Sequence, residues 1–117
     1  MIELLTQVDK PGVIECSMVL SGKEVVASSF PAEYKNHATI GKQAFIYVFS
    51  NVAKMRTKHN ESHLEIGDRR ISGYQLKPGL ILVCLSAKDS NIALVRKHIR
   101  EVHTAFLREQ VAKKLDS

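Results

Sequence analysis

Apolar residues between positions 31 and 55 form two rows, and each row has the spacing of an α-helix. The first row has gaps of three or four and comprises Tyr34, Ala38, Gly41, Phe45, Val48, Val52 and Met55, with Phe49 widening it. The second row lies about 100° round the helix from the first and comprises Ile40, Ala44, Tyr47 and Asn51. Pro31 suits the first turn, because its missing N–H has no intrahelical partner there. The pattern therefore predicts one long helix with two apolar faces.

A helix at the surface of a monomer needs only one apolar face, so the second row requires an explanation. One interpretation is a single wide stripe that packs into the core of a monomer. The other is a helix that covers a sheet with one face and meets another molecule with its second face. We favour the second interpretation, because the two rows are separated around the helix.

The segment before the long helix predicts a short helix and a pair of strands. The apolar residues of the short helix are Ile2, Leu4, Leu5 and Val8. A Pro-Gly turn at residues 11–12 ends it. Residues 13–20 and 24–30 have the composition of strands, and Gly22 between them can adopt the positive φ of a tight turn. These two strands therefore form an antiparallel hairpin.

Three further strands and a last helix follow the long helix. The strands are predicted at residues 63–66, 70–76 and 80–86, and Gly73 in the second indicates a bulge or a close contact. Residues 80–86 are apolar on both faces, which is typical of a central strand covered from both sides. Asp89 or Ser90 caps the last helix. Its apolar stripe comprises Ile92, Val95, Ile99, Val102 and Phe106.

These elements predict one α/β domain of the α+β type that spans residues 1–117, without an internal repeat or linker. Their order is helix, two strands, helix, three strands and helix (α-β-β-α-β-β-β-α). The simplest packing is an antiparallel five-stranded sheet with helices on both faces, a three-layer sandwich.

The element order and several local sequences resemble the Roadblock family, which includes Roadblock dynein light chains, Ragulator subunits and prokaryotic regulators of small GTPases. The resemblance covers nearly the whole chain. It rests on the long helix, on VLSGKEVVASS at residues 19–29 and on PGLILVCLSAKDSNIALVRKHI at residues 78–99. Members often have Asp-Gly or Glu-Gly at the hairpin turn, where this chain has Ser21-Gly22-Lys23, and its last helix is longer than in many eukaryotic members. Longin and profilin-like domains have a related layout and are the structural alternatives.

The resemblance implies a Roadblock-like fold and a dimeric adaptor or regulator of a small Ras-like GTPase, a scaffold rather than an enzyme. Dimers of the family place their central helices side by side and join their third strands at the edges. The implied interface residues of this chain are Ile40, Ala44, Tyr47, Asn51, Leu64 and Ile66. The second subunit is another copy or a paralogous Roadblock subunit, and recruitment to membranes through partners is compatible with such a platform. The alternative is a longin- or profilin-like interaction module in trafficking or signalling without a GTPase partner.

The positive charge of the chain argues against a nucleic-acid-binding protein. The net charge of +5 is spread over several elements instead of one stripe, and the chain has no Trp for stacking. Arg96, Lys97 and Arg100 on the last helix serve solubility, or attract an acidic partner or anionic lipid headgroups. Arg69 and Arg70 are formal candidates for an arginine supplied to a GTPase, a role that the family resemblance disfavours.

Sequence motifs for catalysis, a metal or a cofactor are absent. Neither GxxxxGK[ST] nor GxGxxG occurs, so nucleotide hydrolysis by this chain is not expected. His59 and His63 lack a third ligand in a matching register and are predicted to be solvated. The sequence therefore predicts no catalytic, cofactor-binding or metal-binding residues.

Two features favour a location in the cytoplasm. No apolar run reaches the ~20 residues that span a bilayer, and the N-terminus lacks the basic region of a signal peptide. Cys16 and Cys84 lie inside apolar runs of strands expected to be neighbours, and we predict that both are buried, free thiols.

Overall fold

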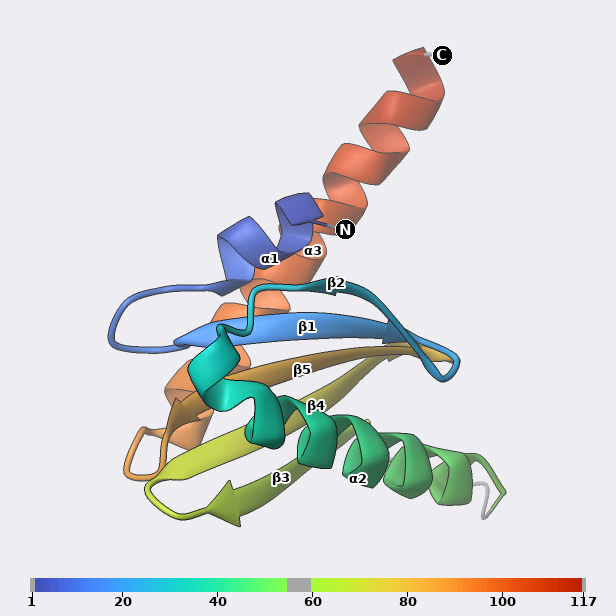
Figure 1. The fold of residues 1–117 in the computed structure, drawn as a ribbon. Helices are drawn as coiled ribbons and strands as arrows, with labels where there is room; N and C mark the ends of the chain where they lie inside the picture. The colour runs from blue at the N-terminus through green and yellow to red at the C-terminus, as the bar shows by residue number, and fades with distance from the viewer. Residues whose placement is uncertain (1, 55–59, 117) are drawn as a thin grey trace.

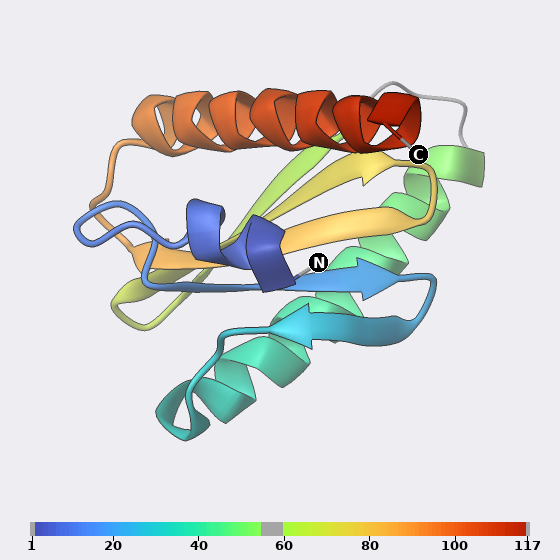
Figure 2. The ribbon, with the colours of Figure 1, turned by 90° about the horizontal axis from the view of Figure 1, so that it is seen from above.

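The computed structural model describes residues 2–54 and 60–116, with side chains described for residues 2–52 and 60–108. A five-stranded sheet lies between two layers of helices (Figure 1, Figure 2). The strands are β1 (Cys16–Ser21), β2 (Glu24–Ser28), β3 (Glu61–Ile66), β4 (Arg69–Lys77) and β5 (Leu80–Ala87). The helices are α1 (Ile2–Val8), the short 3₁₀ helix η1 (Ala32–Tyr34), α2 (Lys35–Lys54) and α3 (Ile92–Asp116). The predicted fold class and element order are confirmed.

All neighbouring strands are antiparallel, and the strand order is β2-β1-β5-β4-β3. β5 therefore lies in the middle of the sheet, and β2 and β3 form its two edges. α2 covers one face, while α1 and α3 pack side by side on the other (Figure 1, Figure 2). The sheet is thus covered on both faces and free at both edges in the described part of the chain.

β5 is buried on both faces because the helices cover the sheet from both sides. Ile81, Val83 and Leu85 belong to the apolar cluster beneath α2. Leu82 and Cys84 belong to the cluster beneath α1 and α3. The alternation of these side chains between two cores confirms the interpretation of residues 80–86 as a central strand.

Two glycines allow α2 to lie close to the sheet. Gly73 of β4 sits against the ring of Phe45, and a Cβ added to this glycine would lie only 2.7 Å from the ring. Gly41 of α2 faces the sheet in a similar way, with 3.1 Å between such a Cβ and the nearest side-chain carbon. Gly73 therefore marks a close contact, and the irregularity in β4 falls later, between residues 75 and 77.

The sheet begins at Cys16 instead of at residue 13, because the preceding residues form a turn. The Lys10 carbonyl accepts hydrogen bonds of 2.9 Å from the N–H groups of Val13 and Ile14. Gly12 permits this turn because its φ of 80° is strained for residues with a side chain. The strand predicted at residues 13–20 was therefore too long at its start.

Both long helices begin later than predicted. Pro31 has an extended conformation, with ψ of 165°, and η1 separates it from α2. At the start of α3, Asn91 is the capping residue, since its Oδ1 accepts a hydrogen bond of 2.8 Å from the N–H of Ala93. The cap predicted at Asp89 or Ser90 was wrong, because these residues lie in the turn before the helix. Met55 lies outside the described residues.

Candidate protein interface

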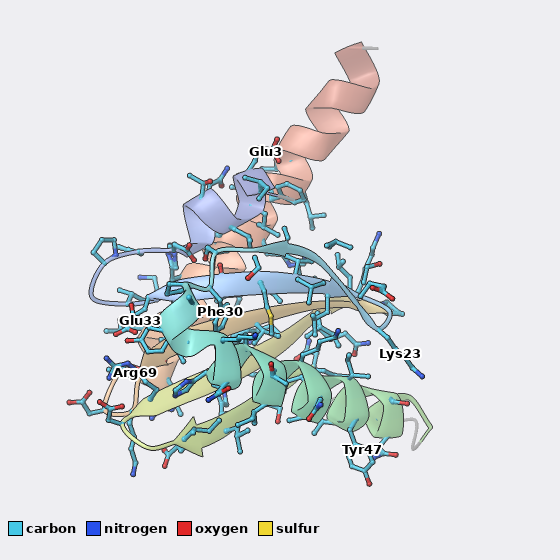
Figure 3. All side chains as sticks on the ribbon, viewed as in Figure 1. Glu3, Lys23, Phe30, Glu33, Tyr47 and Arg69 are labelled. Atoms are coloured by element: carbon cyan, nitrogen blue, oxygen red, sulfur yellow. The ribbon has the colours of Figure 1, made fainter. Side chains whose placement is uncertain are left out.

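The second apolar row of α2 lies at the surface of the isolated chain. Tyr47 is 71% exposed and Ile40 is 41% exposed, whereas Phe45 in the first row is 1% exposed. Ala44 and Asn51, the other two members of the second row, are half-buried. Figure 3 shows Tyr47 pointing away from the sheet. The rows therefore differ most at their large side chains, since Phe45 of the first row lies in the core and Tyr47 of the second row lies at the surface.

β3 places Leu64 and Ile66 on the same side of the sheet as α2. Both side chains are half-buried and pack against the apolar cluster beneath α2. β3 pairs with β4 along one side, and its other side pairs with no strand in the described ranges. That free side presents backbone N–H and C=O groups that can pair with another strand. The six predicted interface residues thus lie on two elements that contact each other.

The opposite face of β3 carries a polar cluster that ties the edge strand to α3. Arg96 donates from Nε to Glu61 Oε1 at 2.8 Å and from Nη2 to Glu61 Oε2 at 2.7 Å. His63 Nε2 is hydrogen-bonded to the same carboxylate at 2.6 Å, and its Nδ1 is hydrogen-bonded to Ser72 Oγ at 2.7 Å. Hydrogen bonds from Arg96, and secondarily from His63, hold the pKa of Glu61 below its ordinary value of 4.5, although burial opposes them.

This polar cluster corrects the expectation for His63, which is part-buried and hydrogen-bonded instead of solvated. Glu61 and His63 are two residues apart and therefore lie on one face of a strand. That spacing was the only feature of the sequence that could have indicated the polar cluster. The strand predicted from the sequence started too late, at His63, to include Glu61. His59 lies outside the described residues.

The two arginines at the start of β4 are both engaged within the fold. Arg69 donates to Glu15 Oε2 at 3.1 Å and to the Tyr34 hydroxyl at 3.3 Å, which connects β4 to η1. Arg70 is 7% exposed and donates to the carbonyl oxygens of Ser90 at 2.7 Å and Lys88 at 2.6 Å, which fixes the turn before α3. Neither guanidinium extends from the surface as an arginine that inserts into a GTPase would need to do.

The two cysteines are not activated as nucleophiles. Cys16 and Cys84 are free and buried, as predicted, and they belong to the cores on opposite faces of the sheet. Burial raises the pKa of the Cys16 thiol to about 12 and also raises the pKa of Cys84. Both thiols are therefore protonated at neutral pH and poor nucleophiles. No three His, Cys, Asp or Glu residues within the described ranges are grouped to hold a metal ion.

A groove runs along α2 beside the β1–β2 turn, with a volume of about 530 Å³. We call it the lysine groove, and its lining residues are Lys23, Lys42, Gln43, Ile46, Tyr47, Ser50 and Asn51. Tyr47 and Asn51 also belong to the second apolar row. The groove and the row therefore overlap at these two residues.

The arrangement of helices and strands matches known three-dimensional structures. MglB of Myxococcus xanthus superposes with a TM-score of 0.67 at 10% sequence identity, over 94% of this chain and 90% of that chain. A Roadblock/LC7 domain from Streptomyces avermitilis gives a TM-score of 0.64 at 14% identity, over 95% and 94% of the two chains. The chain has the Roadblock/LC7 fold. No protein-family model matches the sequence, and neither does any curated protein.

The Roadblock/LC7 fold accounts for the arrangement of nearly the whole chain. A third structure, described as MglB with tetrameric arrangement, gives a TM-score of 0.66 at 14% identity, over 92% of this chain and 85% of that chain. At such identities the likeness lies in the helices and strands and not in particular side chains, so the site must be argued from this chain itself. Among the helices described, none is both long enough and apolar enough to cross a membrane.

Proposed function

We propose that this chain is a non-catalytic adaptor that dimerises through α2 and β3 and regulates a small Ras-like GTPase or recruits it to a complex. The observation that carries the proposal is the exposed second row of α2 beside the free edge of β3. A monomer leaves Tyr47 and Ile40 at 71% and 41% exposure, whereas contact with another molecule buries them. The Roadblock/LC7 fold supports a GTPase as the partner, because the sequence resembles a family of GTPase platforms.

A second copy suits this surface because both elements fit a two-fold interface, in which the same patch of each copy meets the other. The second row of α2 carries no charge, so two copies of it can meet without like-charge repulsion. The free edges of two β3 strands can pair antiparallel and continue the sheet from one copy to the other. The neighbour described as MglB with tetrameric arrangement is an example of this fold in an oligomer. A paralogous subunit with the same two elements is the heterodimeric form of the proposal.

The proposed role of this chain is to position segments of the GTPase, and it contributes no catalytic group of its own. Arg69 and Arg70 are held by contacts within the fold, so we propose that the adaptor acts by shifting segments of the GTPase and not by donating a guanidinium to it. We propose that the adaptor acts in the cytoplasm. Any recruitment to a membrane then occurs through partners.

The test of the proposal is binding to the small Ras-like GTPases encoded in the same genome as this chain. Each GTPase is loaded with a fluorescent GTP analogue, and binding, nucleotide release and hydrolysis are measured with and without the adaptor. We expect at least one GTPase to bind and to change its rate of release or hydrolysis. If none binds, the GTPase role is wrong, and a longin- or profilin-like interaction module becomes the better account.

A further inference from the structure

The lysine groove has a composition that the dimer proposal does not explain. Its lining includes two lysines, the apolar side chains of Ile46 and Tyr47, and three neutral polar residues. Lys23 comes from the β1–β2 turn and all the other lining residues come from α2. Figure 3 shows Lys23 at the tip of this turn, near the C-terminal half of α2. Two segments far apart in the sequence therefore place positive charge at one side of an apolar surface.

The positive charge of the groove is not neutralised by the chain. Lys23 and Lys42 have no ion-pair partner among the side chains described. α2 contains three lysines and neither Asp nor Glu along its whole length, Lys35–Lys54. A surface of this kind attracts negatively charged groups, and its apolar centre favours an apolar side chain between them.

We propose that the lysine groove binds an acidic segment of the partner GTPase, in which Asp or Glu side chains flank an apolar side chain. Lys23 and Lys42 contact the carboxylates, and the apolar side chain packs on Ile46. The inference rests on the proposed function, because it names the chemistry of the partner that the adaptor binds. A volume of about 530 Å³ is enough for several side chains of such a segment.

A second copy of the chain is a poor occupant of the groove. A two-fold interface through the groove would bring Lys23 and Lys42 of one copy towards the same lysines of the other, and α2 offers no carboxylate to compensate. The second row of α2 has no such charge. We therefore assign the uncharged row, including Tyr47 and Asn51, to the second copy. The remaining part of the groove, around Lys23, Lys42 and Ile46, is assigned to the GTPase segment.

Two short peptides test the groove without knowledge of the GTPase. The acidic peptide has a central Phe-Leu flanked on each side by Asp-Glu, and the basic peptide has Lys-Lys in place of each Asp-Glu. Each is titrated into the ¹⁵N-labelled full chain, and the backbone amide signals are followed by NMR. We expect the acidic peptide to shift the signals of Lys23 and of residues 42–51 in a saturable manner, and the basic peptide to leave them unchanged.

The binding of the acidic peptide is then compared between a variant with reversed charge in the groove and a control variant with reversed charge elsewhere. The double variant Lys23→Glu and Lys42→Glu should bind the acidic peptide about tenfold more weakly or worse, because two attractions become repulsions. The control is Lys10→Glu with Lys97→Glu, which changes the net charge equally at two exposed positions outside the groove. We expect the control to bind like the wild type.

The inference is overturned if both peptides shift the same signals, if no signal of the groove shifts, or if the control weakens binding as much as the groove variant. It is also overturned if the acidic peptide shifts signals of α3 around Arg96 and Arg100 instead. A GTPase that binds the wild type and the groove variant equally would refute the groove and leave the proposed function standing. Saturable peptide binding without any GTPase partner would refute the proposed function and leave the groove as an acidic-segment site.

Discussion

Arg96 of α3 and Glu61 of β3 form a bidentate ion pair, with 2.8 Å between Nε and Oε1 and 2.7 Å between Nη2 and Oε2. The pair connects the edge strand to the last helix, on the face of the sheet opposite α2. Planar two-point contacts of this kind fix orientation as well as distance. Since β3 pairs with a single strand among the described residues, this contact helps to hold the edge in the position where pairing with another molecule is proposed.

The first prediction is that Arg96→Met loosens β3 before it affects the rest of the sheet. The substitution leaves the Glu61 carboxylate, which is only 17% exposed, without its main hydrogen-bond donor. We expect a lower free energy of unfolding in urea, and hydrogen exchange that accelerates more at the β3 amides than at the β1 and β5 amides. Arg100→Met is the control, because Arg100 is exposed on the same helix. Equal effects of the two substitutions would show that the ion pair contributes nothing to the edge strand.

The second prediction concerns the contribution of Glu61 to the stability of the fold at acidic pH. The pKa of Glu61 is lower in the folded chain than its ordinary value of 4.5, so its ionised form stabilises the fold at pH values above 4.5. This contribution is lost as the pH falls below 4.5 and through the folded-state pKa. The wild type should therefore be more stable than Glu61→Gln at pH 5, and the difference should shrink steadily towards pH 3, as measured by urea unfolding at intervals of pH ~0.5. A difference that grows on acidification would contradict the assigned direction.

The third prediction tests the close packing of α2 on the sheet. A Cβ at position 73 would lie 2.7 to 2.9 Å from three ring carbons of Phe45, so Gly73→Ala forces the ring to move. We expect a loss of about 1–3 kcal/mol in the free energy of unfolding, typical of an overpacked core. Phe45→Leu in the same chain should recover part of this loss, since it removes the ring that the methyl meets. Additive effects of the two substitutions would refute the proposed steric conflict.

The parts of the fold that follow local patterns could be predicted from the sequence. β5 was recognised because apolar residues on both of its faces require cover from both sides, and Ile81 to Leu85 do alternate between the two cores. α2 was recognised from its two rows, and Ile40 and Tyr47 of the second row are exposed. These patterns are local, because spacing along one element determines which side chains share a face.

The parts that depend on distant contacts could not be predicted in the same way. Asp89, Ser90 and Asn91 are all acceptable capping residues, and Asn91 was identified only from its bond to the N–H of Ala93. The Glu61–Arg96 pair joins residues 35 positions apart, and the lysine groove joins the β1–β2 turn to α2. No spacing rule within one element reveals such pairs, so they emerged only from the three-dimensional arrangement.

The central claim is that the second row of α2 is the seam of a dimer, and the most direct measurement is the mass in solution by light scattering on a sizing column. Wild type, Tyr47→Asp and the control Leu94→Asp are compared. Leu94 is 59% exposed, and it lies on α3, on the opposite side of the sheet. The account predicts about twice 13.1 kDa for the wild type and for Leu94→Asp. It predicts 13.1 kDa with unchanged helical circular dichroism for Tyr47→Asp, because a charge buried in an apolar seam is costly. A monomeric wild type, or a Tyr47→Asp variant that stays dimeric, would contradict it.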